Sequence, residues 1–212
     1  MKTLLCYGDS NTFGYDPSNG MRYPKEKRWT TLLAEKLKDD YDIVPEGLNG
    51  RTTDSDWEND DVKNGIRHLE TILRSHRPLD VVVFMLGSND CKDELGKDAD
   101  RIAEGMEKLI LKTKTILKEK QGYVPVIIVV SPPLIREEVA DGPFAFEFSQ
   151  RSVVVCKGLS SAYRELCLKH GCIFADAAGA DVAVPDGLHL SSKGHEDFAD
   201  ILYRTISSLA IH

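Results

Sequence analysis

Short apolar runs of strand length alternate with helical segments along nearly the whole chain, and this alternation restricts the fold more than any other feature. The strand-like runs cover residues 3–7, 41–44, 81–86, 124–130 and 172–174. Helical spacing covers residues 29–37, 62–76, 99–117, 150–169 and 191–209. Regular β-α alternation predicts a parallel sheet with helices on both faces, and five strands are too few to close an eight-stranded barrel. We therefore expect an α/β sandwich built on a five-stranded parallel sheet.

Length and charge narrow the class of protein further. A chain of 212 residues is long enough for one sizeable core, so we expect a single domain over residues 1–212. Because 34 acidic residues outnumber 27 basic ones, giving a net charge of -7, we expect no nucleic-acid partner. No apolar run approaches the roughly 18 residues of a membrane span, and the start of the chain lacks a secretory pattern. We expect no membrane partner and a cytoplasmic protein.

The cysteines predict neither a disulfide framework nor a metal site. There are five of them, an odd number, and they lack CxxC spacing or a paired histidine cluster. We expect reduced thiols that pack in the core, and chemistry that needs no metal and no cofactor.

Ligands of such sheets bind beyond the carboxyl ends of the strands, so the residues that follow the apolar runs are the candidates for chemistry. The first run ends in Gly8-Asp9-Ser10, which places a hydroxyl at a strand end and suits a nucleophile. The triplet is equally typical of a turn in which Ser10 caps a helix.

A serine hydroxyl needs a base, and His189 is the histidine best placed to supply one. It follows Asp186 by three residues in a polar turn before the last helical segment, so the carboxylate can fold back onto imidazole Nδ1. Nε2 is then free to take a proton from Ser10. The alternative is a turn aspartate beside a histidine at a helix start. The other histidines lie on helical patterns or at the terminus, and we expect them to face solvent: His68, His76, His170, His195 and His212.

Two further strand ends offer donors for the negative oxygen of an acyl-transfer intermediate. Asn89 follows the third strand-like run in Gly87-Ser88-Asn89-Asp90, where its amide can donate to an oxyanion. Gly50 follows the second run, and a glycine permits close approach of a backbone N–H. An Asx-turn at Asn89 and an ordinary turn at Gly50 remain the alternatives.

These four segments together resemble the four sequence blocks of the SGNH (GDSL-type) hydrolases. The resemblance rests on Gly8-Asp9-Ser10, Gly50, Gly87-Ser88-Asn89-Asp90 and Asp186-Gly187-Leu188-His189. It implies a flavodoxin-like three-layer α/β/α fold, with Ser10, Asp186 and His189 as catalytic triad. It also implies an oxyanion hole formed by the Ser10 N–H, the Gly50 N–H and the Asn89 side chain.

Within that family the sequence is most similar to the bacterial arylesterase/acyltransferase branch typified by the mycobacterial acyltransferase. The similarity spans nearly the whole chain and includes the segments at residues 6–15, 28–30, 46–53, 78–90 and 130–134. Two positions depart from the pattern. Asn11 stands where the motif that names the family has leucine, and Gly50 stands where the mycobacterial enzyme carries alanine. Acyl transfer to alcohols is therefore left open.

The expected substrate is a small carboxylic ester with a short acyl or an aryl group. Aromatic residues lie near the blocks and in the irregular segment 131–148, and they suit an apolar pocket: Phe13, Tyr15, Trp29, Trp57, Phe144, Phe146 and Phe148. Similar enzymes form homo-oligomers, which we also expect here. The same triad would serve a carbohydrate deacetylase or a thioesterase. A flavodoxin-like binding module without catalysis is a further alternative, but it leaves the Asp186-His189 turn unexplained.

Overall fold

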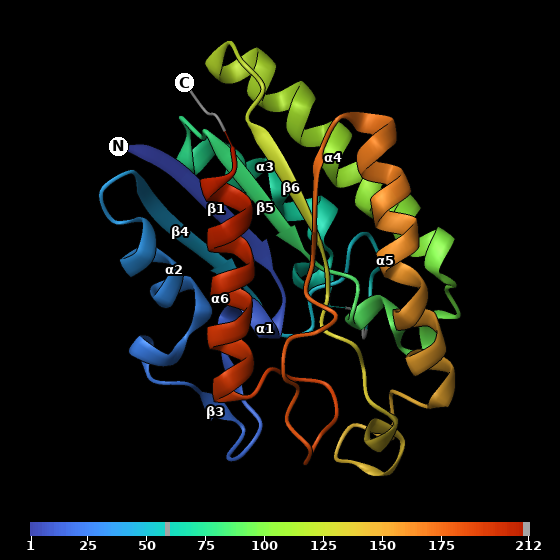
Figure 1. Cartoon of the computed structure of the whole chain (residues 1–212). Coiled ribbons are helices and arrows are strands. Elements are labelled where there is room, and N and C mark those ends of the chain that lie inside the picture. Colours follow the sequence, from blue (N-terminus) through green and yellow to red (C-terminus); the bar gives the residue numbers. More distant parts are fainter. Residues whose placement is uncertain (58–59, 210–212) are drawn as a thin grey trace.

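The computed structural model describes residues 1–57 and 60–209 and contains one main sheet between helices (Figure 1). The strands of this sheet are β1 (Lys2–Gly8), β4 (Tyr41–Gly47), β5 (Val81–Met85), β6 (Val126–Ser131) and β7 (Ile173–Asp176). A small hairpin consists of β2 (Tyr15–Asp16) and β3 (Met21–Arg22). The helices are α1 (Ser10–Phe13), α2 (Trp29–Leu37), α3 (Gly65–His76), α4 (Ala99–Gln121), α5 (Gln150–His170) and α6 (Ser192–Ser207).

The main sheet is parallel throughout and runs in the order β4-β1-β5-β6-β7. Its register pairs Leu5 with Val44 on one side and with Val82 on the other. The expected five-stranded parallel sheet is therefore confirmed. The next strand along the chain, β4, lies on one side of β1, and the later strands β5, β6 and β7 lie on the other side. The direction of winding therefore reverses at β1, and open α/β sheets bind ligands at such a reversal.

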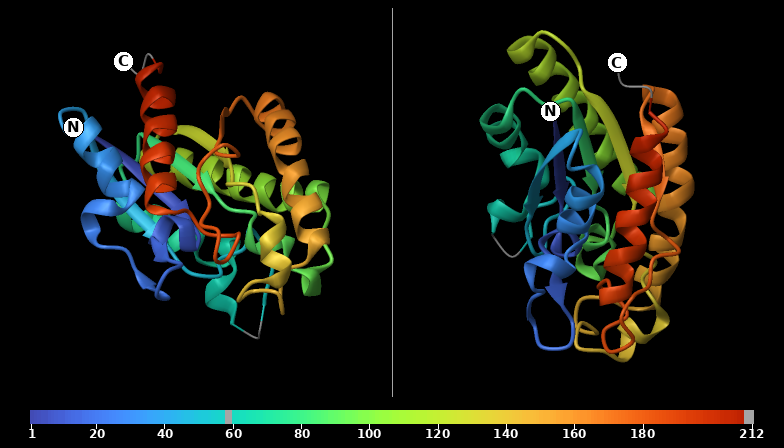
Figure 2. Two further views of the ribbon diagram at one scale, coloured as in Figure 1. Left: turned by 60° about the horizontal axis from the view of Figure 1, so that its bottom comes forward. Right: turned by 60° about the vertical axis from the view of Figure 1, so that its left-hand side comes forward.

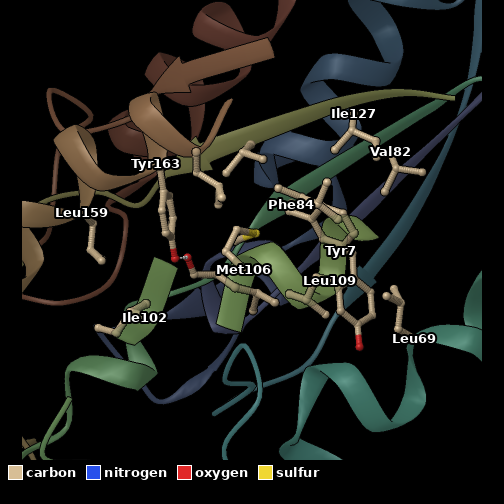
Figure 3. Packing of buried hydrophobic residues seen from close by; sticks show 14 of the residues in the cluster. Tyr7, Leu69, Val82, Phe84, Ile102, Met106, Leu109, Ile127, Leu159 and Tyr163 are labelled. Atoms are coloured by element: carbon tan, nitrogen blue, oxygen red, sulfur yellow. Dashed lines mark hydrogen bonds between the residues drawn. The ribbon is translucent and has the colours of Figure 1, made fainter. Parts of the chain in front are cut away.

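Alternate residues of each strand point into two separate hydrophobic cores, one on each face of the sheet. The sheet and the helices on its two faces form the three layers of the sandwich. Leu5, Tyr7 and Phe84 point into a core shared with α3, α4 and α5, whereas Leu4 and Cys6 point into one shared with α2 and α6. Figure 3 shows Phe84 edge-on to Tyr7, with ring centroids 5.9 Å apart. Full burial of each such apolar side chain contributes about 1.5–3 kcal/mol. Figure 1 shows α2 and α6 side by side on their face of the sheet.

The helix expected over residues 62–76 begins three residues later, at Gly65. The Asn64 side chain accepts a hydrogen bond from the Ile66 N–H, so Asn64 is the N-cap, and the preceding residues Asp61–Lys63 form a 3-10 turn. Four further 3-10 turns lie within the described residues at Lys25–Lys27, Asn89–Cys91, Asp93–Leu95 and Glu137–Asp141. The last of these lies inside the segment 131–148 that the sequence marks as irregular.

The carboxyl ends of the main strands point toward the bottom of Figure 1, and the left view of Figure 2 turns this edge to the reader. The turns that follow β1, β4 and β5 meet there because these three strands are neighbours in the sheet. Across residues 1–57 and 60–209, no helix is both long and apolar enough to cross a membrane.

Candidate active site

Ser10 stands at the first position of α1, directly beyond β1, and is only 7% exposed. Asp9 caps this short helix, because its Oδ1 accepts a hydrogen bond from the Asn11 N–H at 2.9 Å. The turn between strand and helix is tight. A Cβ added at Gly8 would lie 2.1 Å from the Thr12 hydroxyl oxygen, so the sequence needs glycine there to present Ser10 at the strand end.

Asp186 and His189 lie in one turn that is almost closed on itself by hydrogen bonds. Asp186 Oδ1 accepts the backbone N–H groups of Leu188 and His189, at 2.9 and 3.0 Å. Asp186 Oδ2 lies 2.7 Å from His189 Nδ1. Gly187 occupies the left-handed region with φ of 63°, which allows the chain to reverse between the acid and the base.

The two turns meet in a continuous chain of hydrogen bonds. His189 Nε2 lies 2.9 Å from Ser10 Oγ. Since the carboxylate of Asp186 can only accept, Nδ1 carries the imidazole proton and Nε2 is left to accept from the serine hydroxyl. Burial raises the pKa of Asp186, but the hydrogen bonds and charge of His189 and the Leu188 N–H outweigh it, so this pKa lies below its usual value.

Asn89 and Gly50 border the same cavity as Ser10 and His189, which has a volume of about 250 Å³. Asn89 begins the 3-10 turn after β5, and its Nδ2 donates one hydrogen bond to the Arg51 carbonyl at 3.2 Å. An amide nitrogen carries two protons, and among residues 1–57 and 60–209 the second is left available to a ligand. Gly50 has a φ of 77°, which is the left-handed conformation that favours glycine.

A buried carboxylate ties together the two segments that carry Gly50 and Asn89. Asp90 is fully buried and accepts from the Thr53 N–H at 2.9 Å and from the Thr53 hydroxyl at 2.6 Å. Lys97 Nζ lies 3.2 Å from the same carboxylate. The turns after β4 and β5 are therefore fixed relative to each other before any substrate binds.

Sequence reasoning missed Arg51, which lies beneath the site. Arg51 is only 5% exposed, and its guanidinium donates to the Gly8 carbonyl at 2.8 Å and stacks on Tyr7 with 4.1 Å to the ring centroid. Burial raises the pKa of Asp9 to about 7, although the Asn11 N–H and the Arg51 charge act in the opposite direction. The signal available in the sequence was a charged residue directly after Gly50, at the end of a strand.

The expectation that His195 faces solvent is wrong, because this residue is fully buried. His195 lies on the same stripe of α6 as Phe198, Ala199 and Leu202, which packs toward α2. Its Nδ1 accepts the Trp29 N–H at 3.2 Å. Burial lowers the pKa of His195 to about 4, with the neighbouring His189 and Arg28 acting in the same direction.

The other histidines behave differently from His195. His68, His76 and His170 are each partly exposed. His76 Nε2 lies 2.9 Å from Glu46, and His170 pairs with Glu107. The sixth, His212, lies outside the described residues. None of these three partly exposed histidines borders the cavity that contains Ser10.

The expected aromatic pocket is formed by four of the seven aromatic residues. Trp57, Phe148, Tyr15 and Phe144 all line the cavity. The rings of Tyr15 and Phe144 also lie against His189, with ring centroids 4.3 and 5.3 Å from that of the imidazole. Trp29, by contrast, packs on Phe198 between α2 and α6 and does not line the cavity. Phe13 is stacked by Arg22, and Phe146 is 77% exposed.

The cysteines and metal-ligand candidates hold no second centre in the described residues. All five cysteines are free thiols, four of them buried. Within residues 1–57 and 60–209, no three histidine, cysteine, aspartate or glutamate side chains cluster closely enough to hold a metal ion.

Comparison with known proteins gives one family and a set of close structural relatives. Residues 6–196 match the GDSL-like lipase/acylhydrolase family. A carbohydrate acetylesterase family member from Sinorhizobium meliloti is 37% identical, with a TM-score of 0.91 and coverage of 97% of each chain. The aryl esterase of M. smegmatis is 31% identical, with a TM-score of 0.90, covering 99% of this chain and 100% of that one. No curated protein matches the sequence.

Proposed function

The chain belongs to the GDSL-like lipase/acylhydrolase family, and from that premise we propose that it hydrolyses short-chain carboxylic esters through an acyl-enzyme on Ser10. Its family and its esterase relatives make it an ester hydrolase. The observation that carries the finer proposal is the hydrogen-bonded chain from Ser10 through His189 to Asp186, with distances of 2.9 and 2.7 Å, which opens into a cavity of about 250 Å³.

In the proposed reaction Ser10 Oγ attacks the ester carbonyl carbon while His189 Nε2 takes the hydroxyl proton. The electron pair of the carbonyl moves onto its oxygen, which accepts hydrogen bonds from the Ser10 N–H, the Gly50 N–H and the Asn89 amide. When the pair returns, the bond to the alcohol oxygen breaks and His189 protonates that oxygen. Water then repeats the sequence on the acyl-enzyme, releases the carboxylic acid and restores Ser10.

Asp186 serves this cycle by holding the imidazole. Its carboxylate keeps the proton on Nδ1 before the reaction and stabilises the imidazolium that forms during it. The lowered pKa of Asp186 keeps the group ionised at neutral pH. Tyr15 and Phe144 shield the ring of His189 on the cavity side, which limits competition by water for Nε2.

The first experiment is turnover of p-nitrophenyl esters from acetate to decanoate. We expect acetate and butyrate to be preferred, because the cavity is small and several charged side chains border it. Ser10→Ala and His189→Ala should each reduce kcat by more than about ten thousand-fold. Ser75→Ala, at an exposed position of α3, is the control and should be unchanged. Undiminished turnover by either site variant would refute the triad assignment.

Covalent labelling separates catalysis from simple binding. A fluorophosphonate should add one phosphonyl group to the peptide that contains Ser10, since only a serine with a base reacts readily. A flavodoxin-like binding module would leave that peptide unmodified. Dialysis against EDTA should not change turnover, because the proposed steps use protein groups and water alone.

A carbohydrate acetyl ester is the second candidate substrate. The cavity has hydrogen-bonding side chains beside its aromatic rings, namely Asn49, Lys63 and Glu147 next to Trp57, which suits a substrate with hydroxyl groups. A structural relative is described as a carbohydrate acetylesterase family member. A higher kcat/KM for acetylated xylosides than for p-nitrophenyl acetate would favour this substrate, and an acetyl thioester in the same panel tests thioesterase activity.

Acyl transfer and assembly are tested separately. Addition of an alcohol to the assay shows, by the ratio of new ester to free acid, whether transfer competes with hydrolysis. We propose in addition a homo-oligomer in which the 131–148 segment contacts a second copy, because Phe146 in this segment is 77% exposed. Light scattering should give a mass above one chain, and Phe146→Ser should lower it.

A further inference from the structure

Asn11 connects the nucleophile turn with the turn that carries the base. Its side-chain Oδ1 accepts a hydrogen bond from the Leu190 N–H at 2.8 Å, although the two residues lie 179 positions apart. Both residues are buried, with Asn11 only 3% exposed and Leu190 fully buried. A buried hydrogen bond of this kind cannot be replaced by water when it breaks.

This bond is formed by the residues directly after the proposed nucleophile and base. Ser10 meets His189, and the next residue on each side, Asn11 and Leu190, forms the second link. The N–H groups of Leu188 and His189 both turn inward to Asp186. Of these three consecutive amides, that of Leu190 is the one that leaves its own turn and reaches the turn of Ser10.

Asn11 is itself held on two other sides. Its backbone N–H donates to Asp9, and its carbonyl accepts the indole N–H of Trp29 at 3.0 Å. Trp29 is in turn fixed by the bond from its own N–H to His195. The acceptor for Leu190 therefore has a defined position relative to the sheet and to α6, and it does not depend on the substrate.

We propose that Asn11 is a positioning residue that sets the distance between Ser10 Oγ and His189 Nε2 through its bond to the Leu190 N–H. The inference rests on the proposed function of Ser10 and His189. Asn11 does not touch the reacting atoms. It acts because a serine and its base must stay within hydrogen-bond reach, and a shift of about 1 Å costs on the order of a hundred-fold in rate.

The residue type is the point of interest, because the motif that names the family has leucine at this position. A leucine side chain offers no acceptor for the Leu190 N–H. This chain thus holds its base turn by a link that the leucine form of the motif cannot make, and the departure from the motif has a function of its own.

The test uses three substitutions at one position. Asn11→Leu and Asn11→Ala both remove the acceptor, one with a somewhat larger side chain of the same branched shape and one with a smaller side chain. We expect each to lower kcat for p-nitrophenyl acetate by about ten- to a hundred-fold, with KM changed much less. Asn11→Asp keeps a carboxyl oxygen at the same place in either protonation state, so it should retain clearly more of kcat than Asn11→Leu.

The control is Thr12→Val in the same turn. Thr12 is also buried, and within the described residues its hydroxyl makes no hydrogen bond, so an isosteric valine tests disturbance of the turn alone. Its kcat should stay close to that of the wild type. Each rate is divided by the concentration of Ser10 that a fluorophosphonate has labelled once labelling is complete. This normalisation corrects for any unfolded fraction.

A spectroscopic measurement separates positioning from damage to the base turn. The bond from His189 Nδ1 to Asp186 lies within one turn, so its downfield imidazole proton resonance should persist in the leucine and alanine variants. The inference is overturned if both variants keep the wild-type kcat per site, if that resonance is lost in both, or if Asn11→Asp is no better than Asn11→Leu. Wild-type protein without esterase activity would instead overturn the proposed function.

Discussion

At the scale of single residues, Asn89 is oriented by one of its amide protons, and the other is the proposed donor to the oxyanion. The bond from Nδ2 to the Arg51 carbonyl fixes the amide plane at the edge of the cavity. In the proposed reaction, Asn89→Ala removes a donor that acts mainly on the charged oxygen of the transition state. We expect kcat to fall by about a hundred- to a thousand-fold, or roughly 2.7–4 kcal/mol, with a much smaller change in KM.

The measurement combines steady-state kinetics with a melting curve on the same preparation of Asn89→Ala. If Asn89 only shaped its turn, Tm would drop while kcat per folded molecule stayed near the wild-type value. That result would remove Asn89 from the site.

The residues of the site could be predicted because they depend on local sequence and on strand ends. Ser10, Asn89 and the Asp186-His189 turn each follow a strand or precede a helix, so their spacing indicated one edge of the sheet, while their proposed roles came from the family resemblance. His195 was placed wrongly because a histidine was treated as polar. Its position on the apolar stripe of α6, three residues before Phe198, was the better guide. The link from Asn11 to Leu190 is a contact over 179 residues, and no local pattern encodes it.

At the scale of secondary-structure elements, the turn of Ser10 is packed directly against the end of β4. A Cβ added at Gly47 would lie 2.1 Å from the Phe13 backbone nitrogen and 2.5 Å from the Thr12 carbonyl carbon. Gly47→Ala must therefore push α1 away from the sheet. We expect a loss of about 1–3 kcal/mol in the free energy of unfolding, together with reduced kcat because Ser10 moves with the helix.

Gly179→Ala is the matched control, since an added Cβ there meets no atom within 4 Å. Urea unfolding of the two variants gives the comparison. Equal stability of the two proteins would show that β4 and α1 are less closely packed than described.

The alternation of apolar runs predicted the main elements well, and α2 has the expected bounds of Trp29–Leu37. Differences occur where side chains decide an end, as at Asn64, which delays the start of α3. The two-residue strands β2 and β3 were missed because they are too short to show any periodicity. The strand order β4-β1-β5-β6-β7 was not predicted, because hydrophobic periodicity marks the strands but not which of them are neighbours.

At the scale of the whole molecule, two buried groups give the free energy of unfolding opposite dependences on pH. The pKa of His195 is lowered to about 4, from about 6.5 in an unfolded chain, so its contribution is complete above pH 6.5 and is lost as pH falls toward 4. The pKa of Asp9 is raised to about 7, from about 3.9, so its contribution is complete below pH 4 and is lost as pH rises toward 7.

The difference in stability between the wild type and each variant should report the contribution of the group that is substituted. For His195→Gln, the stability lost relative to the wild type should grow between pH 4.5 and 6.5, by up to about 1.4 kcal/mol per pH unit. For Asp9→Asn, the same difference should shrink over this range. Urea unfolding at three pH values measures both slopes. A difference that does not depend on pH for His195→Gln would contradict its burial as a neutral acceptor for Trp29.

The separation of 179 residues between Ser10 and His189 also determines when, during synthesis, the two residues can first meet. A ribosome that makes this chain synthesises the proposed nucleophile early and its proposed base very late, so a nascent chain carries Ser10 through most of translation without His189. A chain that stops before Asp186 lacks both the proposed acid and the proposed base, so we expect it to be inactive toward esters, however well its first strands have formed. Esterase activity in a translation reaction would therefore report chains completed beyond His189, and would lag behind the appearance of the Ser10 segment by nearly the whole synthesis time.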